Sequence, residues 1–274
     1  MAYERISVEP IAGALGAEIY GVDLAAPMDE ATRAEVHDAW MLHQVLFFRD
    51  QTIGPEAHKA FARQFGELHV HPVLPSRREE GHPEIVVLES DASRPFVAEA
   101  WHSDVTFERK PPLGSVLRGA VIPEWGGDTM WSSMYAAYEA LSTAMQRLLS
   151  ELRAVHDGGA FQAIATEGQR RELAQDERTT HPVIRTHPVT GRKAVFVNSA
   201  FTKKIAGMRS KESTALLTFL FEHVGAPELT CRFRWRPNSI AMWDNRCTQH
   251  RVVTDNLHAH RRMERVTICG DEPF

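Results

Sequence analysis

Three side chains that bind metals well stand at positions that could share one ion: His102, Asp104 and His250. Residues i and i+2 of a strand face the same way, so a strand through residues 101–105 would place the imidazole of His102 and the carboxylate of Asp104 on one face. Two imidazoles and one carboxylate occupy one face of an octahedral ion and leave the opposite positions open, as in non-heme Fe(II) oxygenases. The set therefore predicts an oxygen-activating iron site.

Other metals compete for the same residues. The same three ligands suit zinc, so a zinc hydrolase is an alternative, although the chain has no H-E-x-x-H helix motif. Cys247 lies close to His250 in the sequence and could supply a thiolate, but soft sulfur favours metals other than an oxygen-activating Fe(II). His-x-Asp alone is too short to decide between these readings.

Arg261 follows His250 by eleven residues and has the chemistry to anchor a carboxylate. A guanidinium presents a planar fork that pairs with both carboxylate oxygens. The alternative is a surface arginine in the basic stretch 258–262. If a strand through residues 264–269 begins a few residues earlier, Arg261 and Arg265 share a face, and a second guanidinium points into the same cavity.

Four segments match one family pattern in order and spacing: residues 101–107 (WHSDVTF), 126–131 (GGDTMW), 243–246 (WDNR) with His250, and 261–267 (RRMERVT). They resemble the taurine dioxygenase/TfdA-like family of Fe(II)- and 2-oxoglutarate-dependent dioxygenases. The likeness runs nearly end to end, from residues 16–19 to residues 270–271.

The resemblance implies both the cosubstrates and the residues that hold them. It implies Fe(II) on His102, Asp104 and His250, with 2-oxoglutarate and O2 consumed and succinate and CO2 released as a substrate is hydroxylated. Arg261 and the hydroxyl of Thr129 match the residues that bind the far (C5) carboxylate of 2-oxoglutarate. No catalytic side chain is expected beyond the metal ligands.

The resemblance also points to a small anionic substrate. Arg265 and His71 match the residues that hold the sulfonate of taurine, while His69 is taken as structural. A tyrosine of the taurine pattern is replaced by Leu74, and an asparagine by Ala98. Because both changes remove polar contacts, we expect a larger and more hydrophobic substrate, such as a longer alkylsulfonate, a sulfate ester or an aryloxyalkanoate of the 2,4-D type.

The elements that must position these residues are mainly strands. Short, β-rich segments bounded by turn residues predict eight strands, at 45–48, 84–88, 115–121, 181–186, 193–197, 231–235, 239–243 and 265–269. Eight short strands in two sheets would form a jelly roll, whose mouth can hold a ligand. The family likeness implies the same double-stranded β-helix.

Helical patterns lie between the strands and are expected to support the β core without carrying chemistry. They cover residues 30–42, 55–65, 134–156 and 210–224. Residues 160–180 are polar and weakly periodic, and predict an excursion that is either a lid over the site or an exposed helix.

Composition limits the remaining choices. A chain of 274 residues with 43% hydrophobic content can bury one core, so a single domain over 1–274 is expected. The net charge of −5, with no basic run or stripe that could neutralise phosphates, argues against nucleic acid as a partner. With no apolar leader or membrane-length stretch, a cytoplasmic location is expected, with a small molecule as partner and homo-oligomers left open. A β-barrel that binds ligands without catalysis is the alternative outside enzymes.

Overall fold

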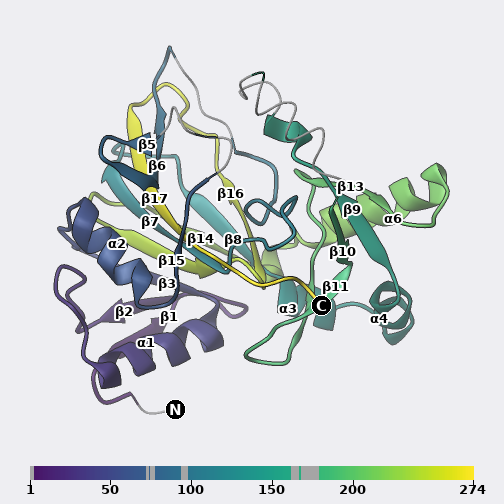
Figure 1. Cartoon of the computed structure of the whole chain (residues 1–274), viewed down its shortest axis with the longest axis horizontal. Helices are drawn as coiled ribbons and strands as arrows, with labels where there is room; N and C mark the ends of the chain where they lie inside the picture. The colour runs from purple at the N-terminus through teal and green to yellow at the C-terminus, as the bar shows by residue number, and fades with distance from the viewer. Residues whose placement is uncertain (1–2, 72–73, 75–77, 94–97, 162–166, 168–178) are drawn as a thin grey trace.

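One large sheet forms the body of the computed structural model, which describes residues 3–71, 74, 78–93, 98–161, 167 and 179–274 (Figure 1). Nine strands pair in this sheet, in the order β1-β2-β3-β15-β7-β17-β6-β5, with β4 also on β17. Their bounds are β1 Ser7–Pro10, β2 Ala17–Tyr20, β3 Val45–Phe48, β4 Leu68–His69, β5 Arg78–Glu79, β6 His82–Ser90, β7 Gly114–Val121, β15 Ile240–Asp244 and β17 Arg261–Ile268.

A second sheet of three strands, β14-β8-β16, lies beside the large one (Figure 1). These strands are β14 Thr230–Phe233, β8 Thr129–Ser133 and β16 Thr248–Val252. Two smaller sheets follow, one of β10 Thr179–Pro182, β9 Arg153–His156 and β13 Thr202–Ile205, the other of β11 Ile184–Thr186 and β12 Lys193–Val195.

Alternation of side chains along the strands explains how the two larger sheets pack. On β15, Ala241 and Trp243 join a buried cluster that also contains Trp131 of β8 and Phe233 of β14. That cluster therefore lies between the sheets. Their neighbours on β15 point the opposite way, since successive residues of a strand face opposite sides, and Met242 belongs to a separate core.

Helices α1 (Glu30–His43) and α2 (Pro55–Arg63) cover the outer face of the large sheet (Figure 1). Trp40 of α1 and Phe61 of α2 pack in the same core as Met242. Helices α3 (Met134–Glu139), α4 (Thr143–Ser150) and α6 (Ser210–His223) lie with β9 to β13 on the other side of the molecule (Figure 1). Two 3-10 turns are η2 (Gly159–Phe161) and η3 (Pro227–Leu229). The expected mainly β fold with supporting helices is confirmed.

The single helix expected over 134–156 is wrong. The Ser142 hydroxyl accepts a hydrogen bond from the backbone N–H of Met145 and caps the start of α4, so the segment breaks into α3 and α4. Residues 153–156 are a strand, β9, because they pair with β10 and β13. Tertiary pairing here overrides a local helical pattern.

Most of the expected excursion at 160–180 lies outside the described residues. No helix among the residues that the structure describes is long and apolar enough to cross a membrane.

Candidate active site

The three expected metal ligands lie together beside the middle of strand β16. One donor atom from each of His102, Asp104 and His250 lies within 4.8 Å of the others. His250 belongs to β16, and His102 pairs with it across an isolated antiparallel bridge. Backbone hydrogen bonds run both ways, from His102 N to His250 O at 3.1 Å and from His250 N to His102 O at 2.8 Å. Two segments far apart in sequence are thereby joined at the site.

The local conformation around Asp104 differs from the expected strand. Only His102 takes part in a bridge, while Asp104 lies in a turn. The next residue, Val105, is in the left-handed region at φ +53°. The two side chains therefore converge through a turn and not through strand periodicity.

The protonation states in this cluster suit a divalent cation. The Nδ1–H of His102 donates to the carbonyl of Ala100 at 2.8 Å, which leaves Nε2 as the ring nitrogen with a free lone pair. Burial lowers the pKa of His102, and burial together with the nearby His102 ring lowers the pKa of His250 well below its ordinary value. Both imidazoles are therefore neutral near pH 7, as ligation requires.

Asp104 is held as a carboxylate by its neighbours. Burial by itself raises the pKa of Asp104, but Arg265 and, to a smaller extent, the rings of His250, His102 and His71 together bring the pKa below its usual range. Arg265 Nη1 donates to Oδ1 at 2.5 Å, and Ser115 Oγ donates to Oδ2 at 3.1 Å. Since a carboxylate has about four lone-pair positions, each oxygen keeps one for a metal.

Arg265 thus contacts the candidate ligand Asp104, a contact that the sequence did not suggest. The alternation along β17 places Thr267 near the same carboxylate as Arg265, since Thr267 Oγ1 lies 3.4 Å from Ser115 Oγ, which donates to Asp104. Met263, two residues before Arg265, packs between the sheets. Arg265 Nε has no hydrogen-bond partner among the described residues. The guanidinium therefore has a donor left for an anion.

Arg261 opens β17 with a buried, unpaired guanidinium. It is 8% exposed, and its Nε and Nη2 have no hydrogen-bond partner within the described part of the chain. Burial lowers the pKa of Arg261 to about 10, although the negative charge of Asp128 acts to raise it. An unpaired buried charge is costly, so this donor set fits the carboxylate of a bound acid.

Thr129 follows the turn that makes room for Arg261. Gly127, at φ +68°, lies so close that an added Cβ would stand 3.2 Å from Cδ of Arg261. Trp235 Nε1 donates to Thr129 Oγ1 at 2.9 Å, so the hydroxyl proton of this buried threonine is free to donate elsewhere. Thr129 thus follows, by two residues, a glycine that packs against the side chain of Arg261.

Of the expected substrate residues, His71 and Leu74 are buried and Ala98 is half-buried. His71 contributes to the electrostatic environment of Asp104, which places it near the cluster. His69 lies beside it, and its Nε2 is 3.1 Å from the carboxylate of Glu108. These positions are compatible with the expected roles, which stay predictions.

An aromatic cluster borders the same region and was not foreseen from the sequence. Phe201 packs edge-on to His102 with ring centroids 6.3 Å apart, and Phe161 packs edge-on to His71 at 5.4 Å. Phe161 and Phe201 stack at 5.7 Å, and Phe107 contacts both. Phe107 lay within the matched motif, but no local periodicity marks the other two rings.

A second donor cluster, His187, Asp244 and Cys247, is structural by its hydrogen bonds. His187 Nδ1 accepts from the backbone N–H groups of Val189 and Thr190, so its Nε2 carries the proton that is donated to Asp244 at 3.0 Å. Both Asp244 oxygens also bind Arg246. No free imidazole lone pair remains for a metal, and Cys247 falls in this cluster instead of the first.

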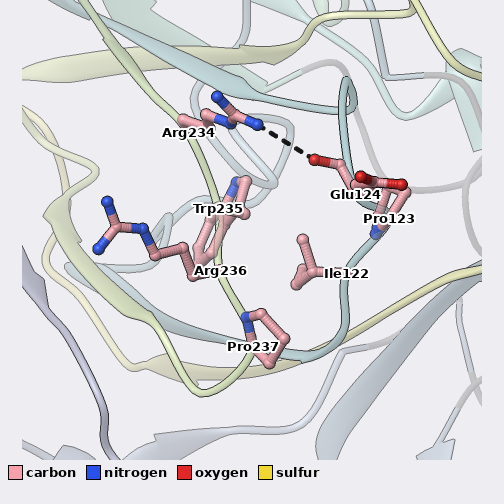
Figure 2. A pocket seen from close by; sticks show the side chains of 7 residues that line it. All are labelled: Ile122, Pro123, Glu124, Arg234, Trp235, Arg236 and Pro237. Carbon is pink, nitrogen blue, oxygen red and sulfur yellow. Dashed lines mark hydrogen bonds between the residues drawn. The ribbon is translucent and has the colours of Figure 1, made fainter.

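A cleft of about 540 Å³ lies elsewhere, between residues 122–124 and 234–237 (Figure 2). Figure 2 shows Arg234 reaching toward Glu124, whose backbone oxygen accepts a hydrogen bond from its Nη2 at 3.1 Å. None of the lining residues is a candidate metal ligand. Trp235 connects the cleft to the site, since its indole also donates to Thr129.

A β-sandwich that gathers two neutral imidazoles and a carboxylate near an unpaired buried arginine defines the class of non-heme iron, 2-oxoglutarate-dependent oxygenases. Residues 7–267 match the family described as taurine catabolism dioxygenase TauD, TfdA family. The chain belongs to this family.

Curated relatives and a solved structure agree with that assignment. An alkylsulfatase of Acinetobacter baylyi is 36% identical over 98% of this chain and 86% of its own length. An alpha-ketoglutarate-dependent sulfate ester dioxygenase of Pseudomonas putida is 35% identical over 98% and 91%. The crystal structure of a taurine dioxygenase from Burkholderia xenovorans superposes with a TM-score of 0.86 at 37% identity, covering 98% of this chain and 93% of that one.

The family resolves the alternatives on enzyme class. The protein is an oxidoreductase that depends on 2-oxoglutarate (alpha-ketoglutarate), and the family uses Fe(II) and O2 with it. The zinc hydrolase and the non-catalytic barrel are therefore not supported.

Proposed function

We propose that His102, Asp104 and His250 hold Fe(II), and that Arg261 and Thr129 bind the far carboxylate of 2-oxoglutarate. The observation that carries the proposal is the gathering of the three donors within 4.8 Å. The buried and unpaired Nε and Nη2 of Arg261 support the second half.

When bound, the iron and 2-oxoglutarate activate O2 and oxidise a substrate C–H bond, with release of succinate and CO2. The protein's own residues orient the reactants. Ser115 and Arg265 hold the Asp104 carboxylate in one direction, and the carbonyl of Ala100 sets the tautomer of His102. The stacked rings of Phe161 and Phe201 lie beside His71 and His102 and give this side of the cluster an apolar border.

The substrate class we propose is an alkyl sulfate ester or alkylsulfonate with an apolar tail. Arg265 keeps a donor for the anionic group, and His71 lies near the same carboxylate. The aromatic cluster of Phe107, Phe161 and Phe201 offers apolar surface for the tail. The names of the two curated relatives agree with a substrate that carries a sulfo group.

The site of hydroxylation determines the products. Insertion of OH at the carbon bearing the sulfate oxygen forms an unstable intermediate that collapses to an aldehyde and sulfate. At the carbon bearing a sulfonate sulfur, the collapse yields an aldehyde and sulfite. An aryloxyacetate would instead release a phenol and glyoxylate, so product analysis separates the three substrates.

The test is a screen of alkyl sulfates, alkylsulfonates and aryloxyacids with Fe(II) and 2-oxoglutarate, which follows succinate and the released anion. We expect one equivalent of sulfate or sulfite per succinate, with kcat/KM rising along the chain-length series beyond taurine. Each buried methylene should gain about 0.8 kcal/mol, or roughly fourfold. Highest activity with taurine, falling along the series, would contradict the apolar pocket.

The metal assignment has a separate test. His102→Ala and Asp104→Ala should each weaken Fe(II) binding strongly and leave almost no succinate coupled to product, because each removes one of only three protein ligands. Far-UV circular dichroism should stay native. Wild-type turnover in both variants would contradict the assignment.

We further infer a single domain over 1–274, which the family match over residues 7–267 supports. We also infer a cytoplasmic location for the enzyme, as expected from the amino-acid sequence.

A further inference from the structure

The segment that carries His102 and Asp104 is tied to residues 245–250 at three successive points. The backbones of His102 and His250 bond each other, as described above. Ser103 Oγ donates to the carbonyl of Thr248 at 2.8 Å. Asn245 then bonds the backbone of Asp104. Both ligand-bearing segments therefore move as one unit if these ties hold.

Of these three links, the one through the Asn245 side chain has the most hydrogen bonds. Its Oδ1 accepts from the N–H of Asp104 at 2.7 Å, and its Nδ2 donates at 3.0 Å to the carbonyls of Asp104 and Pro112. The residue is 1% exposed, and both amide hydrogens are used. One side chain thus fixes the peptide groups on both sides of Asp104.

The backbone at this point needs such support. Val105, directly after Asp104, is held at φ +53°, in the left-handed region that β-branched residues rarely adopt. Such a conformation persists only when its surroundings enforce it. The Asp104 carbonyl bonded by Asn245 belongs to the peptide that joins Asp104 to Val105, so the amide acts directly on the strained link.

We propose that Asn245 is a positioning residue for the metal site. It acts through Asp104, by holding the Asp104–Val105 backbone in the conformation that aims the carboxylate at the two imidazoles. This inference rests on the proposed metal site. It differs from a merely structural role, because it predicts loss of metal affinity beyond any loss of stability.

The chain offers a matched control at the opposite end of β15. Gln51 makes the same set of bonds with its amide: Oε1 accepts from Leu24 N at 2.8 Å, and Nε2 donates to the carbonyls of Val22 and Arg49 at 3.1 and 3.0 Å. Its own N–H bonds Asn238 O, just before β15 begins. Removing either amide costs three hydrogen bonds to the backbone, but only the amide of Asn245 lies at the metal site.

The experiment compares Asn245→Ala with Gln51→Ala. The Mn(II) dissociation constant is measured by titration under electron paramagnetic resonance, and stability of the metal-free protein by urea unfolding. We expect both variants to lose stability, and only Asn245→Ala to raise the Mn(II) dissociation constant, by about 10- to 100-fold as for other residues that orient metal ligands. Equal Mn(II) affinity in the two variants would overturn the proposal.

Two further variants keep the outcome decisive. Asn245→Ser places no charge in this buried position and keeps a hydroxyl that can serve one of the backbone groups left unpaired in Asn245→Ala, so it should lose less stability. Because the hydroxyl cannot replace all three bonds, Asn245→Ser too should bind Mn(II) more weakly, and unchanged affinity would count against the proposal. Adding Val105→Gly should reduce the effect of Asn245→Ala, since glycine adopts positive φ without strain, and an undiminished effect would refute the strain argument. If Asp104→Ala itself leaves Mn(II) affinity unchanged, the metal site has failed and not the role of Asn245.

Discussion

At the scale of single residues, Arg261 has the most direct consequence for cosubstrate binding. Its buried Nε and Nη2 have no partner in the described parts of the chain, and a guanidinium left so is unfavourable until an anion arrives. Arg261→Lys keeps the charge and loses the planar fork, so the KM for 2-oxoglutarate should rise about tenfold, equivalent to about 1.4 kcal/mol.

Steady-state kinetics with 2-oxoglutarate varied at saturating substrate would measure this change. Arg49→Lys is the control, because Arg49 pairs with Glu18 on a distant strand and makes no contact with the site. An unchanged KM in Arg261→Lys would mean that the far carboxylate binds elsewhere.

At the scale of elements, the close approach of β7, β15 and α1 determines how the large sheet packs. A Cβ on Gly114 would stand 2.6 Å from the carbonyl of Trp243 and 2.7 Å from Cζ2 of Trp40. Neither atom can move easily, because one is backbone in a paired strand and the other is a buried ring. Gly114→Ala should therefore destabilise the protein by about 1–3 kcal/mol.

Urea unfolding at constant m-value would report this loss. Gly13→Ala is the matched control, because no atom lies within 4 Å of the position that its added methyl group would take, and the substitution is otherwise the same. Equal midpoints for the two variants would show that the sheet relaxes around the added methyl group.

At the scale of the whole molecule, buried histidines make the free energy of unfolding depend on pH. Burial lowers the pKa values of His58, His156 and His181 to about 4, 3 and 4. In the unfolded chain these three imidazoles become protonated near pH 6.5, whereas in the folded chain they stay neutral until the pH falls to about 4 or below. Stability is therefore fully present above pH 6.5 and is lost as the pH falls toward 4.

His58 is the best single test of this acid dependence, because it lies on α2, away from the metal cluster. Its Nε2–H donates to the carbonyl of Val116, a bond that the amide of His58→Gln can replace without titrating. Between pH 6.5 and pH 4, the free energy of unfolding of the metal-free variant should fall by about 3 kcal/mol less than that of the metal-free wild type. His258→Gln is the control, because His258 is exposed. If the free energy of unfolding depended on pH in the same way in His58→Gln and in the wild type, the prediction would be contradicted.

Strand positions could be predicted well and some elements could not, for a physical reason. Residues 45–48 alternate between two cores, and this period-two pattern is visible locally. Residues 153–156 look helical on their own and become β9 only because β10 and β13 pair with them. Strands β8 and β16 were also missed, although they carry Thr129 and His250.

The sequence by itself determined the ligand types, their order along the chain and the family, because these depend on residue identity and spacing. Only the tertiary structure decided how they meet. His102 bonds a residue far along the chain, Asp104 sits in a turn where a strand was expected, and Arg265 pairs with Asp104. Such contacts depend on the path of the intervening chain, which brings β16 beside His102 and which no local pattern encodes.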